Sequence, residues 1–190
     1  MGAIDGFHDV LTADPPITRQ AGEVEEFSEP THPVPGEETS RAIPSRVILA
    51  KHNLPDEVII AGILHDTVED TSLTLEKIES EFGSSVAAYV KLCSELNKGE
   101  SWKKRKLGYL DQLENAPNDV LFIVCVDKLT NIQSIQRNFE VYGPAIWQKF
   151  NAGYEEQKWY YEAILEKLSP ICNHPLYEAL QSAITRVFNY

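Results

Sequence analysis

The feature that most constrains the fold of this chain is an apolar run, Val58–Leu64, which ends abruptly in polar residues. Four residues that can bind a metal or carry a proton follow within six positions: His65, Asp66, Glu69 and Asp70. We expect one helix over residues 57–70, with Asp56 as its N-cap. Since residues four apart share a helix face, the four polar side chains should gather at one end of a largely buried helix.

Three carboxylates at the end of a buried helix repel one another and resist burial. A divalent cation bound among them would relieve both effects. The alternative is that His65 is a hydrogen-bonded core residue and that the acids form a solvated helix end. The spacing alone leaves both interpretations open.

The rest of the chain is dominated by helical periodicity and by residues that start or stop helices. Leu107, Leu110 and Leu113, for example, are spaced three apart. We found no alternating strand pattern of useful length and no internal repeat. The expected fold is an all-α helical bundle, with helices at 47–52, 75–82, 86–96, 102–115, 119–137, 154–168 and 175–190.

Composition limits the class of protein. A chain of 190 residues, 43% of them hydrophobic, can bury one core. Its net charge of −12 with no basic block disfavours nucleic acid as a partner. The lack of a long apolar run disfavours a membrane span. Three widely spaced cysteines (Cys93, Cys125 and Cys172) and an N-terminus unlike a signal peptide predict reduced thiols in a cytoplasmic protein.

A second polar pair lies far away in the sequence. Asp127 and Asn131, one helical turn apart, follow the apolar run Leu121–Val126. If this helix meets the one that carries His65 and Asp66, a metal site is assembled from distant segments. Nitrogen and oxygen ligands without cysteine suit Mn²⁺, Fe²⁺ or Zn²⁺.

Four stretches of the chain resemble the HD-domain hydrolases of the RelA/SpoT type, and among them the single-domain small alarmone hydrolases such as metazoan SpoT homologues. They are AGILHDTVEDTSLTLEKIESEFG (61–83), SELNKGESWKKRK (94–106), VDKLTNIQSI (126–135) and WQKFNAGYEEQKWYYEAILEKL (147–168). The likeness extends over residues 47–168, and the block at 61–71 is its most specific part. It implies an HD-domain bundle that hydrolyses the 3′-diphosphate of (p)ppGpp, giving GDP or GTP and pyrophosphate.

The resemblance also assigns roles to residues. It implies Mn²⁺ or another divalent cation bound by His65, Asp66 and Asp127, with Glu69 and Asp70 orienting and deprotonating the attacking water. For the substrate it implies the basic residues Lys98 and Arg105, the asparagine Asn131, and an aromatic segment represented by Tyr160. The alternative for that aromatic segment, residues 159–161, is a stripe that packs helices together.

The N-terminal part departs from the family pattern, which places a basic segment and then a His-Pro dipeptide before the His-Asp helix. Arg19 falls in a weak match to the basic segment, and His32, followed by proline, is the best candidate for a further metal ligand. However, His32 lies about nine residues too far from Val47. His8, His52 and His174 are poorer candidates. The alternative is an incomplete site.

We therefore divide the chain into a divergent, loop-rich N-terminal part (1–45), an HD hydrolase core (46–170) and a C-terminal helix (171–190), which could cap the bundle or form a homodimer face. A small nucleotide is the expected partner. Two alternatives remain: an HD phosphohydrolase for another nucleotide, such as an adenosine alarmone or NADPH, and a degenerate, non-catalytic HD module.

Overall fold

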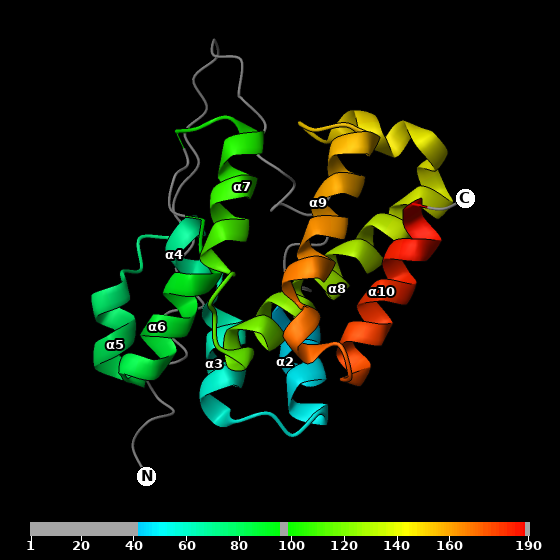
Figure 1. Cartoon of the computed structure of the whole chain (residues 1–190). Coiled ribbons are helices and arrows are strands. Elements are labelled where there is room, and N and C mark those ends of the chain that lie inside the picture. The colour runs from blue at the N-terminus through cyan, green and yellow to red at the C-terminus, as the bar shows by residue number, and fades with distance from the viewer. Residues whose placement is uncertain (1–41, 96–98, 189–190) are drawn as a thin grey trace.

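The computed structural model describes residues 42–95 and 99–188, and these form an all-α bundle (Figure 1). The predicted fold class is confirmed. The helices, in chain order, are α2 (Ala42–Lys51), α3 (Asp56–Leu64), α4 (Thr67–Asp70), α5 (Leu75–Phe82), α6 (Ser84–Cys93), α7 (Trp102–Gln112), α8 (Asn118–Tyr142), the 3₁₀ helix η1 (Gly143–Lys149), α9 (Tyr154–Lys167), the 3₁₀ helix η2 (Ser169–Ile171) and α10 (Pro175–Phe188).

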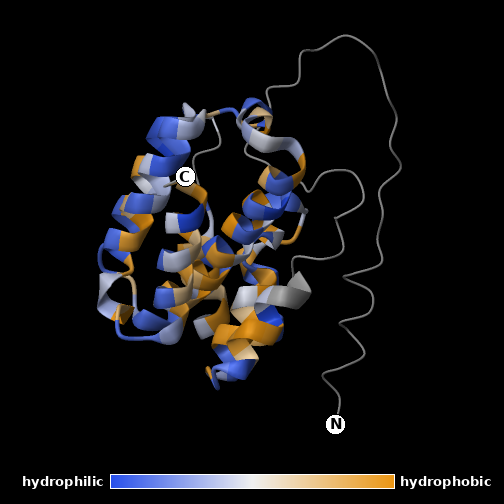
Figure 2. Cartoon of the chain, turned by 90° about the vertical axis from the view of Figure 1, so that its right-hand side faces the viewer, coloured by the Kyte–Doolittle hydropathy of each residue, from blue (hydrophilic) through white to orange (hydrophobic). Residues whose placement is uncertain are grey.

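The long helix α8 is the centre of the bundle. It has 25 residues, which corresponds to about 37 Å, and it contacts α2, α3, α6, η1, η2 and α10. Figure 1 shows α4, α5 and α6 on one side and α9 and α10 on the other, with α2 and α3 below. Hydrophobic residues line the surfaces where the helices face one another (Figure 2). The two apolar runs of the sequence thus pack together, and this packing brings their polar ends close.

Local sequence signals account for several helix ends. Thr74 caps α5, because its side chain accepts a hydrogen bond from the Lys77 amide, and Gly83 ends α5 with a positive φ of 91°. Gly62 in α3 permits a close approach to α2, since a Cβ there would overlap the buried Leu49 side chain. The close packing of Gly62 against Leu49 sets the position of α3 and thus of the polar residues that follow α3.

Two expectations about the helices were wrong. The single helix expected over 57–70 is broken into α3 and α4, with His65 and Asp66 in the turn between them, and Asp56 is the first residue of α3 rather than its N-cap. Of the three leucines spaced three apart, Leu110 and Leu113 are buried and Leu107 is 45% exposed, while Lys106 and Tyr109 join Leu110 on the buried face of α7. Helix α2, Ala42–Lys51, includes most of the segment expected to be helical at 47–52.

The three cysteines are free thiols, as predicted, with Cys93 and Cys125 buried and Cys172 exposed. The C-terminal helix α10 packs along α8 and α9 and so closes one side of the bundle. None of the helices in the described part of the chain is long and apolar enough to cross a membrane. Residues 1–41 of the loop-rich N-terminal part lie outside the described residues.

Candidate metal centre

The turn between α3 and α4 is stabilised by side chains that form hydrogen bonds with carbonyl groups at the end of α3. His65 Nδ1 lies 3.0 Å from the carbonyl oxygen of Gly62, and Thr67 Oγ1 donates to the carbonyl of Leu64 at 2.6 Å. These carbonyls belong to the last turn of α3, where the helix has no partner for them. Because a carbonyl can only accept, Nδ1 of His65 is the protonated nitrogen, and Nε2 is the atom left to face the site.

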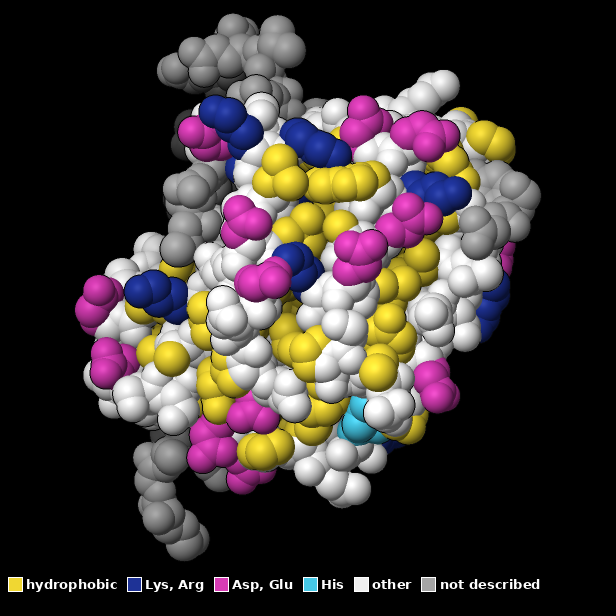
Figure 3. Space-filling model, in the orientation of Figure 1, with side chains coloured by type: hydrophobic (Ala, Val, Ile, Leu, Met, Phe, Trp, Pro, Cys, Tyr) yellow, Lys and Arg dark blue, Asp and Glu magenta, His cyan; other side chains and the backbone are white. Residues whose placement is uncertain are grey.

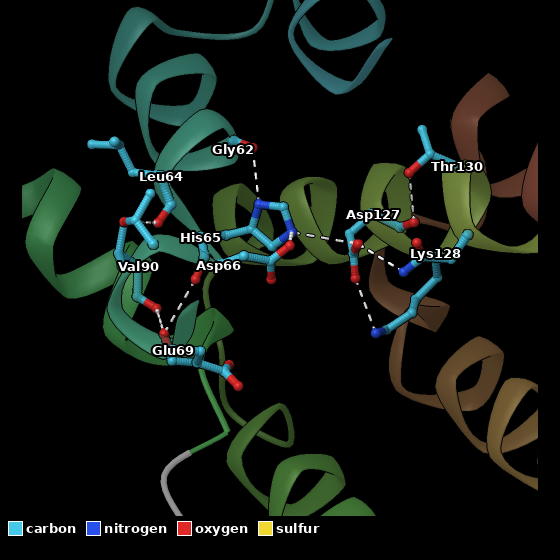
Figure 4. Close-up of polar contacts among 12 residues, drawn as sticks. Gly62, Leu64, His65, Asp66, Glu69, Val90, Asp127, Lys128 and Thr130 are labelled. Atoms are coloured by element: carbon cyan, nitrogen blue, oxygen red, sulfur yellow. Dashed lines mark hydrogen bonds and ion pairs between the residues drawn. The ribbon is translucent and has the colours of Figure 1, made fainter. Parts of the chain in front are cut away.

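Three side chains converge at this turn from segments about sixty residues apart. His65 Nε2 lies 3.1 Å from Asp66 Oδ2 and 3.4 Å from Asp127 Oδ1 (Figure 4). One ligand atom from each residue falls within 4.8 Å of the others. The structure therefore brings together the three described residues that the sequence singled out as metal ligands. Asp66 is half exposed, with 51% of its side chain accessible, which leaves the cluster open to solvent on one side.

The charges in this cluster favour a cation at Nε2. Burial lowers the pKa of His65, but the Asp66 and Asp127 carboxylates outweigh it and raise the pKa well above its usual value. Burial acts to raise the pKa of Asp127, but Lys128 and His65 lower it by more than burial raises it. The pKa of Asp127 is therefore below its usual value, and the carboxylate stays ionised. Nε2 is buried and makes no well-formed hydrogen bond, although two carboxylates lie beside it. An imidazole nitrogen between two carboxylates, without cysteine, suits a divalent metal ion, which would take the place of the proton on Nε2.

Asp127 is held from two further directions. Its Oδ1 accepts a hydrogen bond from Asn131 Nδ2 at 2.9 Å, and its Oδ2 lies 2.9 Å from Lys128 Nζ. Asn131, which was expected to contact the substrate, orients the Asp127 carboxylate through this hydrogen bond. Sequence reasoning missed Lys128, although it directly follows Asp127. Its side chain is 12% exposed and lies 5.5 Å from the Tyr160 ring, a placement that no spacing rule indicates.

The two expected catalytic acids, Glu69 and Asp70, lie on α4, one turn beyond the cluster. The Glu69 carboxylate accepts a hydrogen bond from the Glu95 amide at 2.7 Å, and in Figure 4 it points away from the His65 ring. Asp70 is exposed, and its amide donates to Asp66 O. The catalytic roles of Glu69 and Asp70 stay predictions.

A second polar layer connects α7 with α9 beside the cluster. Lys106, 1% exposed, pairs with Glu95 and lies 4.8 Å from the Tyr160 ring. Arg105 Nη1 is 3.7 Å from the same Glu95 carboxylate. Tyr160 is buried next to Lys106 and Lys128, so packing and a place near the site coexist in this residue. Sequence reasoning missed Lys106, which a helical count of the buried face of α7 would have found.

Three expected site residues, Arg19, His32 and Lys98, lie outside the described residues, and their roles stay predictions. The surface above α7 and α9 carries basic and acidic side chains side by side (Figure 3). No continuous basic surface is visible on this face among the described residues.

Comparison with known proteins gives the same fold. The HD domain family matches residues 36–154. The crystal structure of lmo0812 from Listeria monocytogenes EGD-e superimposes with a TM-score of 0.73 at 30% identity, covering 80% of this chain and all of that one. A solved metazoan orthologue of SpoT that hydrolyses ppGpp superimposes with a TM-score of 0.60 at 21% identity, covering 77% and 78% of the two chains.

Among proteins of known function, the guanosine-3′,5′-bis(diphosphate) 3′-pyrophosphohydrolase MESH1 of Danio rerio is 32% identical over 94 residues. The matched region is 49% of this chain and 52% of that protein. The chain therefore spans about half the length of this relative.

Proposed function

Because the chain belongs to the HD-domain family, we propose that it is a metal-dependent hydrolase that removes the 3′-diphosphate of (p)ppGpp, giving GDP or GTP and pyrophosphate. The observation that carries the proposal is the convergence of Asp66, from the α3–α4 turn, and Asp127, from α8, onto the buried Nε2 of His65. The likeness to pyrophosphohydrolases of this alarmone supports the choice of substrate.

His65, Asp66 and Asp127 would hold the cation, which we propose to be Mn²⁺. When bound, such a cation supplies Lewis acidity toward a phosphate oxygen and toward water. The protein prepares the ligands for it. The Nδ1–H bond to Gly62 O keeps Nε2 aimed at the carboxylates, and Lys128 holds the outer oxygen of Asp127. His32 is proposed as a further ligand.

The remaining groups act on the substrate and on the proton. Glu69 or Asp70 takes the proton from water, since both lie within one turn of Asp66. Arg19, Lys98 and Arg105 are proposed to bind the phosphates, and Asn131 and Tyr160 the rest of the nucleotide. Cations placed around a diphosphate stabilise the charge that develops on the leaving pyrophosphate.

The HD core proposed at 46–170, the cytoplasmic location and a homodimer through the C-terminal helix remain our expectations. The small nucleotide is the partner that the site residues are proposed to recognise. An adenosine alarmone or NADPH in place of ppGpp would use the same metal ligands, so a panel of these nucleotides is needed to define the base and phosphate preference.

Replacement of Asp66 by alanine tests the proposed function. Asp66 is half exposed, and its loss should therefore abolish ppGpp hydrolysis with little change in the helical circular dichroism. Asp56→Ala is the matched control, because Asp56 is an exposed acid in the first turn of α3 and lies outside the cluster. Equal turnover by Asp66→Ala and the wild type would refute the assignment of the site.

A further inference from the structure

The segment that follows α6 holds the α3–α4 turn at two points. Ser94 Oγ, which donates to the Val90 carbonyl at 2.9 Å, also lies 3.3 Å from the His65 carbonyl oxygen, and the Glu95 amide donates to the Glu69 carboxylate at 2.7 Å. Ser94 is 1% exposed and the Glu95 side chain 14%. The orientation of the Glu69 side chain therefore depends on where residues 94 and 95 lie.

The Glu95 side chain is in turn held by α7. Its Oε1 accepts a hydrogen bond from Lys106 Nζ, and its Oε2 lies 3.7 Å from Arg105 Nη1. The Lys106 side chain is 2% exposed, and a buried ammonium group strongly favours a carboxylate partner. On the same helix, Gln112 Nε2 donates to the carbonyl of Leu92 at 2.7 Å and holds the end of α6. Residues 92–95 are thus tied to α7 by side chains of α7 itself.

We propose that Glu95 is a positioning residue for Glu69. The Glu95 carboxylate is held by Lys106 and Arg105. The backbone amide of Glu95 donates the hydrogen bond that orients the Glu69 carboxylate. Glu69 has a long side chain with several rotatable bonds, so an amide that fixes one oxygen removes much of its freedom before substrate binds. The inference rests on the proposed function, in which Glu69 handles the proton of the attacking water.

A double-mutant cycle on ppGpp hydrolysis tests this role. Glu95→Gln should lower kcat by about 10- to 100-fold, the effect of a misplaced catalytic group. In a Glu69→Gln background the same change should have little further effect, since no carboxylate remains to be positioned. If the fold-losses in kcat of the two single variants simply multiply in the double variant, Glu95 acts through the general stability of the fold. That result would overturn the proposal.

Glu114→Gln is the matched control for Glu95→Gln. Glu114 also pairs with a lysine, Lys167, but at the far end of α7 and on the surface. Its replacement should leave kcat unchanged. If Glu95→Gln does not fold, Glu95→Asp keeps the charge but shortens the side chain, and it can enter the same cycle.

Hydrogen exchange at the Glu95 amide, followed by NMR, tests the geometry without any substrate. Glu69→Ala and Glu95→Gln should each raise the exchange rate at residue 95, corrected for intrinsic rates, by about five- to tenfold. Glu114→Gln should not change it. If the wild type fails to hydrolyse ppGpp, the proposed function is wrong, while the exchange rates still decide the positioning role. An unchanged rate in Glu95→Gln would overturn that role.

Discussion

Replacing Asp127 by asparagine should destroy the metal centre while the protein stays folded. Asp127 brings α8 into the cluster, with Oδ1 3.4 Å from His65 Nε2 and Oδ2 2.9 Å from Lys128 Nζ. Asparagine has the same shape but no charge, and it offers one neutral oxygen in place of a carboxylate. The substitution therefore separates the electrostatic role of Asp127 from its packing.

The structure sets the size of both effects. Loss of a group that only orients a metal ligand costs about 10- to 100-fold in metal affinity, so loss of a direct ligand should cost more than about 100-fold. The Asp127 and Lys128 side chains are 15% and 12% exposed, so their ion pair is well covered. A hydrogen bond between charged groups contributes about 1.5–3 kcal/mol, and we expect the metal-free variant to lose about 2 kcal/mol in free energy of unfolding.

The assay is manganese content after equilibrium dialysis, together with urea unfolding in the presence of a chelator. Asp119→Asn is the matched control, because Asp119 lies on the same helix about 12 Å earlier and accepts a hydrogen bond from Tyr89 at 2.7 Å. The control should lose some stability but retain full metal binding. Manganese binding by Asp127→Asn equal to that of the wild type would show that Asp127 is not a metal ligand.

Three further predictions follow from particular contacts. Asn131→Ala should weaken metal binding about 10- to 100-fold by freeing the distal carboxylate; an unchanged affinity with a raised KM would assign Asn131 to the substrate alone. Gly62→Ala should lower the free energy of unfolding by about 1 kcal/mol, because overlap with Leu49 exceeds the gain in helix propensity, and equal stability in urea would contradict this. Burial and nearby His52 lower the pKa of His174, so folding favours its neutral form, and stability should fall as the pH drops from about 6.5 through that lowered pKa. His174→Gln should lose less stability in this range, and an equal loss measured by urea unfolding at pH 7.5 and 5 would contradict the assignment.

The helices of this bundle could be predicted where the signal is local. Helix α5 spans the predicted range 75–82, and it is bounded by Thr74 and Gly83, because a side-chain cap and a positive φ are properties of single residues. The break after Leu64 could not be predicted from periodicity. The break depends on the hydrogen bonds that the His65 and Thr67 side chains make to carbonyl groups at the end of α3. It also depends on Ser94, which lies almost thirty residues later and contacts the His65 carbonyl.

The residues of the candidate site likewise fall into those that the sequence could predict and those that depend on tertiary packing. His65, Asp66 and Asp127 could be predicted to meet because each follows an apolar run and matches a family motif. Helical periodicity could have placed Lys106 on the buried face of α7, but its ion pair with Glu95 could not be predicted, since a pair between segments that flank a loop leaves no periodic trace. The meeting of such groups depends on how α6, α7 and α9 pack, which is a property of the whole bundle.

The most direct test of the account is the product formed from ppGpp by the purified wild-type chain with Mn²⁺. We expect one pyrophosphate and one GDP for each ppGpp consumed, no turnover after treatment with a chelator, and recovery when Mn²⁺ is restored. Intact ppGpp under all these conditions, or release of orthophosphate in place of pyrophosphate, would contradict it.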